Sequence, residues 1–64
     1  MNTSAPALPL LLTVPQAAEQ LQVSEYVVRQ MLRLGDLRGV KHGNHWRVPT
    51  AALTTWIDNH IYTP

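Results

Sequence analysis

One segment of this chain is bounded at both ends by residues that start and stop a helix. Ser24 carries a side-chain oxygen that can accept a hydrogen bond from a free N–H group at a helix start. Gly35 stands just after the last periodic residue, where left-handed backbone geometry is wanted. The apolar residues between these ends have the spacing of one helical stripe, and they are Val28, Met31 and Leu32. The sequence therefore predicts an amphipathic helix over residues 25–34.

The side of this predicted helix that faces away from the apolar stripe is polar and basic. Beginning with the residue at its start, this side carries Ser24, Glu25, Tyr26, Arg29, Gln30 and Arg33. Arginine paired with guanine and glutamine paired with adenine are contacts that read base edges in the DNA major groove. Because any surface helix has a polar side, this pattern alone is as typical of a solvated helix as of one that reads DNA.

Another helix is predicted immediately before this one, and it ends about three residues earlier, at Leu21. Thr13 and Gln16 have the spacing of a capping box, and Pro15 falls in the first turn, where a missing N–H is tolerated. The small apolar face of this helix consists of Val14, Ala17, Ala18 and Leu21. We expect Val23 to fill the turn between the helices. Two helices joined by a tight turn, with the second one basic outside, form the helix-turn-helix plan.

The middle of the chain has the pattern of a β-hairpin. Extended segments over residues 37–42 and 45–48 flank the turn Gly43-Asn44, which is of the Gly-X kind. The inward-facing residues are expected to be Val40 and Val48. The tip and outer face are expected to carry Lys41, Asn44, His45 and Arg47. A lone hairpin is barely stable, so it must lie on the helices and project as a wing.

These elements predict one small α+β domain with the fold of a winged helix-turn-helix. A third helix is expected to run from Pro49 or Thr50 to about Asn59 and to close the core with Leu53, Trp56 and Ile57. The expected divisions are a flexible tail over 1–11, the domain over 12–61 and a short end over 62–64. We expect Leu11 or Leu12 to pack against the core.

The charges are segregated, although the net charge of the 64 residues is only +1. All basic residues lie between positions 29 and 47, and they are Arg29, Arg33, Arg38, Lys41 and Arg47. Only Asp36 opposes them there, so this segment carries +4 and the remainder −3. A segregated basic segment is the electrostatic pattern of a nucleic-acid-binding surface. The alternative is a chance cluster in a short chain.

The sequence contains no recognisable catalytic or metal-binding constellation. The chain has no cysteine, its four acids are scattered, and no carboxylate or thiolate completes a site with His42, His45 and His60. No apolar stretch is long enough to span a bilayer. We therefore expect a cytoplasmic protein that is not an enzyme and that has no cofactor, no metal and no membrane partner.

Three stretches, taken in order, resemble the excisionase-type winged helix-turn-helix family, whose relatives include the MerR headpiece. The stretches are LTVPQAAEQLQVS, YVVRQMLRLGDL and VKHGNHWRVPTAAL, within residues 12–57. That family typically has an Ala-Ala pair, a Val-Ser before the recognition helix, a Gly-acid-Leu turn and a wing that ends in Trp-Arg-Ile/Val-Pro. Glu25 and Tyr26 depart from it, because arginine or lysine is frequent at those positions. Leu34 replaces a small polar residue, and it is expected either to contact a protein or to pack on the hairpin.

The resemblance implies which residues contact double-stranded DNA. In the major groove they would be the residues on the polar side of the 25–34 helix, together with Ser24. In the wing, near the backbone and minor groove, they would be Lys41, His42, Gly43, Asn44, His45 and Arg47. The implied function is that of an excisionase, or recombination directionality factor, which binds tandem DNA sites cooperatively through self-association and works with a tyrosine or serine integrase of a phage or mobile element. Two alternatives stay open: a small MerR-like transcriptional regulator, and a winged helix used only for protein–protein interaction.

Overall fold

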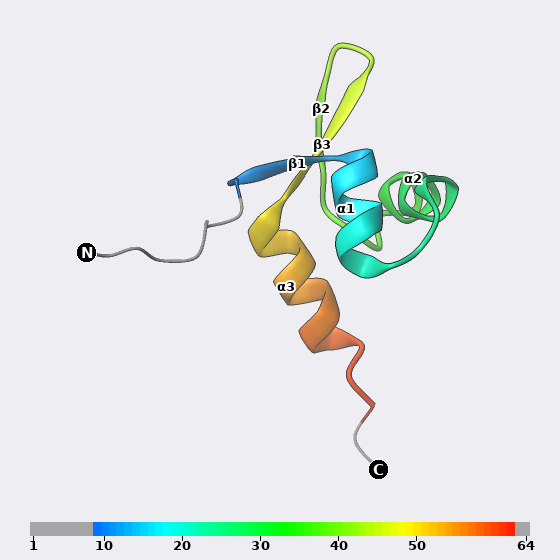
Figure 1. Ribbon diagram of the computed structural model, residues 1–64, viewed down its shortest axis with the longest axis vertical. Coiled ribbons are helices and arrows are strands. Elements are labelled where there is room, and N and C mark those ends of the chain that lie inside the picture. Colours follow the sequence, from blue (N-terminus) through cyan, green and yellow to red (C-terminus); the bar gives the residue numbers. More distant parts are fainter. Residues whose placement is uncertain (1–8, 63–64) are drawn as a thin grey trace, which may run out of the picture.

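The computed structural model describes residues 9–62 of the chain. Its elements, in chain order, are β1 (Leu11–Thr13), α1 (Val14–Leu21), α2 (Glu25–Leu34), β2 (Val40–His42), β3 (His45–Pro49) and α3 (Thr50–Asn59). The predicted order of helix, turn, helix, hairpin and helix is confirmed, and the fold is a small α+β winged helix-turn-helix. The hairpin and α3 extend in opposite directions from the two packed helices (Figure 1).

The sheet has three antiparallel strands in the order β1-β3-β2, so β3 pairs with a strand on each side. The sequence predicted only the hairpin, and β1 is an addition at the start of the domain. Leu12 pairs with Val48, and the backbone N–H of Thr50 donates a 2.9 Å hydrogen bond to the carbonyl of Leu10. The Thr50 hydroxyl also donates to the carbonyl of Pro9. Residues 1–8 of the predicted tail and residues 63–64 of the predicted end lie outside the described part.

The predicted helix caps are confirmed. Thr13 Oγ1 accepts a 3.2 Å hydrogen bond from the backbone N–H of Gln16, and Gln16 Oε1 accepts one of 2.9 Å from the N–H of Thr13. Ser24 Oγ accepts a 3.1 Å bond from the N–H of Val27 at the start of α2. Gly35 ends α2 with a φ of +80°. Each of these caps satisfies groups that a helix terminus leaves without an intrahelical partner.

The turn between α1 and α2 is built differently from the expectation. Gln22 ends α1 in the left-handed conformation, with a φ of 59°, and the N–H of Val23 donates to the carbonyl of Ala18 at 3.0 Å. The backbone therefore closes the turn through its own hydrogen bonds. Val23 does not fill the turn, because its side chain stays exposed.

The core is formed where α1, α2, β1, β3 and the start of α3 meet. Its buried members are Leu12, Val14, Ala17, Ala18, Val28, Met31, Leu32, Leu37, Val48 and Leu53. Leu12 packs inward as expected, and Leu37 is a buried residue that the sequence did not single out. Trp56 is half-buried at the margin, where its ring stacks on His60 with the centroids 4.1 Å apart. The expectation for Ile57 is wrong, because α3 extends past the core and leaves this side chain 46% exposed.

The inward position expected for Val40 is also wrong. The two-residue turn pairs His42 with His45, and this register pairs Val40 with Arg47. Cross-strand partners share a face of the sheet, and successive residues of a strand alternate between faces. Val48 is completely buried on one face, so Val40 lies on the other face, where it is exposed.

Candidate nucleic-acid interface

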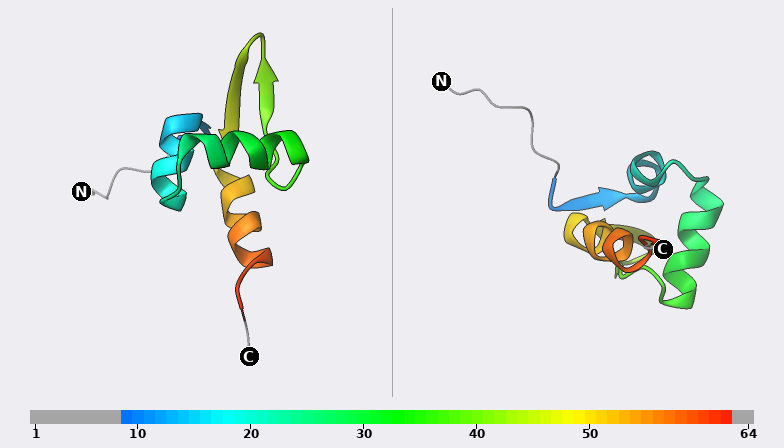
Figure 2. Two further views of the ribbon diagram at one scale, coloured as in Figure 1. Left: turned by 90° about the vertical axis from the view of Figure 1, so that its right-hand side faces the viewer. Right: turned by 90° about the horizontal axis from the view of Figure 1, so that it is seen from below.

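Helix α2 forms one edge of the molecule and turns its polar side outward. Seen from that side, α2 lies across the front, the β2–β3 hairpin rises above it and α3 extends below it (Figure 2, left). Val28, Met31 and Leu32 bury the opposite side of the helix against the core. The six positions named from the sequence, Ser24 at the N-cap and five on α2, are all exposed except Gln30, which is partly covered. The structure thus brings them together on one surface.

The charged and amide groups on this surface form two pairs. Nη1 of Arg29 lies 3.5 Å from Oε1 of Glu25, one helical turn earlier, and about half of each side chain is exposed. Nη1 of Arg33 donates a 2.8 Å hydrogen bond to Oε1 of Gln30. Exposed pairs of this kind add only a few tenths of a kcal/mol to helix stability, about 0.2–0.5 per pair.

Three hydrophobic side chains also lie open on α2. Tyr26 is 67% exposed and Leu34 is 73% exposed, at the two ends of the helix. Val27 is 40% exposed, and the sequence assigned it to neither side of the helix. Leu34 therefore does not pack on the hairpin, and that alternative is excluded. In a helix that lies in the major groove, an exposed apolar side chain can contact the methyl group of thymine.

The β2–β3 hairpin forms the wing, and its turn carries Gly43 with a φ of +64°. Asn44 follows with negative φ, which is the pattern of a Gly-X hairpin turn. Nζ of Lys41 lies 5.5 Å from the centroid of the Trp46 ring, within the range of a cation–π contact. The indole thereby attracts the ammonium group of Lys41, and the lysine as a whole stays exposed.

The two cations of the wing lie on opposite faces of the hairpin, which corrects the expectation of one outer face. Lys41 pairs with Trp46, whereas Arg47 pairs with Val40 on the other face. Arg47 is half-buried and its Nη1 donates a 3.0 Å hydrogen bond to the carbonyl of Trp46. His42 and His45 share the Arg47 face near the tip. The wing therefore offers positive charge on both sides rather than as one flat basic surface.

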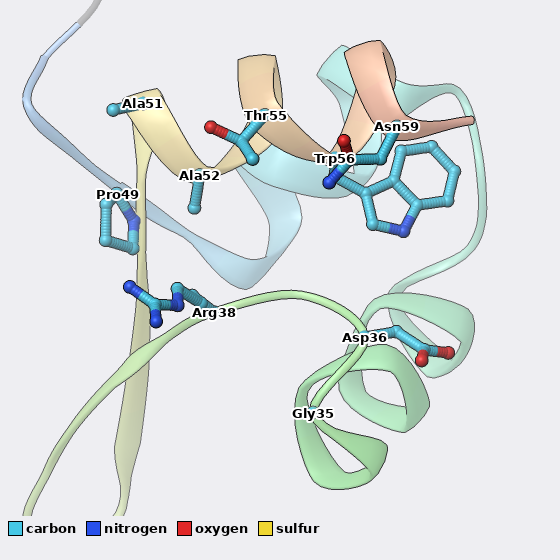
Figure 3. Close-up of a pocket in the computed structure, with 9 residues that line it drawn as sticks. All are labelled: Gly35, Asp36, Arg38, Pro49, Ala51, Ala52, Thr55, Trp56 and Asn59. Carbon is cyan, nitrogen blue, oxygen red and sulfur yellow. The ribbon is translucent and has the colours of Figure 1, made fainter. Parts of the chain in front are cut away.

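A pocket of about 420 Å³ lies between α3 and the segment over residues 35–38. Arg38 lies at the Pro49 side of this pocket and Asp36 at the Trp56 side (Figure 3). None of the residues predicted to contact DNA lines it. Arg38 belongs to the basic segment of the sequence, and it lines this pocket together with Pro49 and residues of α3.

The described residues also bear on metal and membrane chemistry. In residues 9–62, no three histidine, cysteine or acidic side chains are grouped so that they could hold a metal ion. His60 lies at the end of α3, where its Nδ1 is 2.7 Å from the carbonyl oxygen of Trp56. No helix in this part of the chain is both long and apolar enough to cross a bilayer.

Comparison with known proteins agrees with the arrangement of α1, α2 and the wing. Residues 11–60, which are most of the chain, match a family described as a helix-turn-helix domain. The match begins at β1 and ends just after α3, so it spans both the two-helix unit and the wing. No curated protein and no solved structure matches the chain at a significant level.

Proposed function

The chain belongs to the helix-turn-helix domain family, a family that implies DNA binding, and we propose from this premise that it is a sequence-specific architectural protein. It acts as an excisionase, or recombination directionality factor, for the integrase of a phage or another mobile element. The observation that carries the DNA-binding part is the outward polar side of α2, with Arg29 and Arg33, beside a projecting hairpin. The excisionase part rests on the resemblance of the ordered sequence stretches to that family.

In this proposal α2 enters the major groove and the wing reaches the adjacent backbone. The N-terminal half of α2 presents Glu25, Tyr26 and Arg29, and its C-terminal half presents Gln30 and Arg33. The groove is about 12 Å wide, which admits a single helix. Lys41 and Arg47, on opposite faces of the hairpin, can then contact phosphates on both sides of the wing.

A single copy of this chain should bind DNA weakly. The α2 surface carries two arginines and one glutamate, so its net charge is only +1. Each phosphate that is neutralised adds affinity and salt dependence, and few cations are available here. Strong occupancy therefore requires several copies side by side, and adjacent copies can bend the duplex. The Leu34 side chain, exposed at the end of α2, is the apolar group that we assign to contact between neighbouring copies.

A gel-shift titration at two salt concentrations tests this function. The probes are short duplexes from the protein's own locus that carry one, two or three copies of any direct repeat found there. The excisionase-like role predicts stepwise, cooperative complexes on the longer probes, which weaken as salt increases. Binding to isolated sites without cooperativity would instead identify a transcriptional regulator. Absence of any complex at low salt would leave protein–protein interaction as the function.

Two sets of variants test DNA binding by α2 and cooperativity between neighbouring copies separately. Arg29→Ala combined with Arg33→Ala should abolish specific binding while circular dichroism shows an intact fold, because both side chains are exposed. Arg38→Ala removes an exposed cation outside the proposed surface and is the matched control. Leu34→Ser should preserve binding to one repeat and reduce cooperativity on three. Wild-type binding by the double variant would contradict the proposed interface.

A further inference from the structure

The pocket between α3 and the segment over residues 35–38 takes no part in the proposed DNA contacts. Its volume of about 420 Å³ falls within the usual range of ligand sites, roughly 300–1,000 Å³. The segment over residues 35–38 forms one wall, and α3 forms the other wall (Figure 3). The groups along these two walls decide what the pocket can hold.

The segment wall carries two charges of opposite sign. Asp36 and Arg38 both line the pocket and lie at opposite ends of it (Figure 3). Leu37, which stands between them, is buried in the core, and its backbone N–H donates a 3.1 Å hydrogen bond to the carbonyl of Met31. The backbone that carries both charges is therefore anchored, while the charged side chains stay at the surface.

Neither charge has a partner within residues 9–62. The ion pair found in this part of the chain lies on α2, and the side-chain hydrogen bonds found there involve neither Asp36 nor Arg38. A ligand matches such a pocket when its charges have the opposite signs at the two ends. DNA does not fit this description, because a phosphate near Asp36 would be repelled. The pocket therefore favours a ligand that carries both a cation and an anion.

The α3 wall adds an unused hydrogen-bond donor. Small side chains line its first turns, and the half-buried Trp56 follows them. The indole nitrogen of Trp56 lies on the edge of the ring that faces the 35–38 segment (Figure 3). Among the described residues this N–H has no acceptor, although an indole N–H in a partly buried position usually finds one. A peptide carbonyl is a suitable acceptor.

We propose that this pocket binds an extended segment of a partner protein that has a basic and an acidic side chain two positions apart. Alternate residues of an extended chain project to the same side, so one segment can present both charges to the pocket. The basic side chain lies beside Asp36 and the acidic one beside Arg38, while a backbone carbonyl accepts from Trp56. Asp36 and Arg38 are also two positions apart, at most about 7 Å between their Cα atoms, which matches this spacing. This goes beyond the proposed function, because no residue proposed to contact DNA lines the pocket.

An NMR titration of the full chain with short synthetic peptides tests the proposal. The probes have blocked ends and carry Lys-Ala-Glu or Glu-Ala-Lys between serines and alanines, and the control peptides carry Lys-Ala-Lys or Glu-Ala-Glu. The indole N–H signal of Trp56 should shift with the probes, whereas that of Trp46 on the wing should not. The control peptides should bind about two- to fivefold more weakly, as expected for exposed charge pairs.

Equal binding of probes and control peptides, or no shift of the Trp56 signal, would overturn the proposal and leave DNA binding untouched. The same Trp56 shift with a mixture of free lysine and free glutamate would also overturn it, because the site would then take small molecules. Failure of the proposed function is distinguishable, since it appears in the gel shift and not in this titration.

Charge reversal gives the sharper test. Arg38→Glu should change the preference of the pocket, so that the Lys-Ala-Lys peptide binds more tightly than the Lys-Ala-Glu peptide. Arg33→Glu is the matched control, because Arg33 is an exposed arginine that does not line the pocket, and this variant should keep the wild-type preference. A wild-type preference in Arg38→Glu would overturn the assignment of the acidic side chain to Arg38, and the proposal with it.

Discussion

Leu12 of β1 pairs with Val48 of β3, and both side chains are almost fully buried. This pairing connects the segment before α1 to the base of the wing. We expect Leu12→Ala to lower the free energy of unfolding by about 2–5 kcal/mol, the usual cost of such a core truncation. A loss of that size is a large share of the stability of a small domain. Urea unfolding measures it.

Leu11→Ala is the matched control for this change. Leu11 is the preceding residue of the same strand, but its side chain points the other way and is exposed. Leu11→Ala should therefore lower the free energy of unfolding only slightly. Equal losses for the two variants would show that Leu12 is not a core residue.

Gln22→Gly should stabilise the protein. Gln22 holds a left-handed φ of 59° at the end of α1, a conformation that costs a residue with a Cβ about 1–2 kcal/mol. Glycine removes this penalty, and we expect a gain of up to about 1 kcal/mol, which a shift of the thermal midpoint would report. Gln20→Gly, at an exposed position inside α1, should instead lower the free energy of unfolding by about 1 kcal/mol. A loss in both variants would contradict the left-handed turn.

Gly39→Ala should destabilise the domain through crowding. A Cβ at this position would lie 2.5 Å from Cδ2 of Leu32 and 3.1 Å from Cε3 of Trp46. Leu32 is buried and has little room to move, so we expect a cost of about 1–3 kcal/mol. Combining the change with Leu32→Ala should cost less than the sum of the two single variants, because the clash is removed. Full additivity in urea unfolding would show that the two residues do not touch.

Lys41→Ala should reduce the salt dependence of DNA binding. If its ammonium group neutralises one phosphate, the slope of log affinity against log salt should decrease in magnitude by about 0.9. The affinity should decrease by a similar factor for all duplex sequences, because a phosphate contact carries no base information. Lys41→Arg keeps the charge and should retain the wild-type slope. An unchanged slope in Lys41→Ala would exclude Lys41 from the interface.

The apolar pattern alone predicts the wrong environment for Val40 and Ile57, which are both exposed. The sequence predicts the turn Gly43-Asn44, and a two-residue turn already fixes His42 opposite His45. Counting back along both strands places Val40 opposite Arg47 and on the face away from Val48. The register rather than hydrophobicity decides this placement. Ile57 continues the apolar period of α3, but periodicity does not indicate how far along a helix the core reaches.

The local signals in the sequence determined the bounds of the helices, their caps and the hairpin turn. These features depend on groups a few residues apart, such as Thr13 with Gln16 and Ser24 with the N–H of Val27, so the sequence contains them directly. Only the tertiary structure decided that residues 11–13 form a strand. Three residues carry too little pattern to predict a strand, and β1 is held by its pairing with β3, more than thirty positions away. Tertiary packing also decided which apolar side chains are covered, because burial requires a partner surface that distant segments provide.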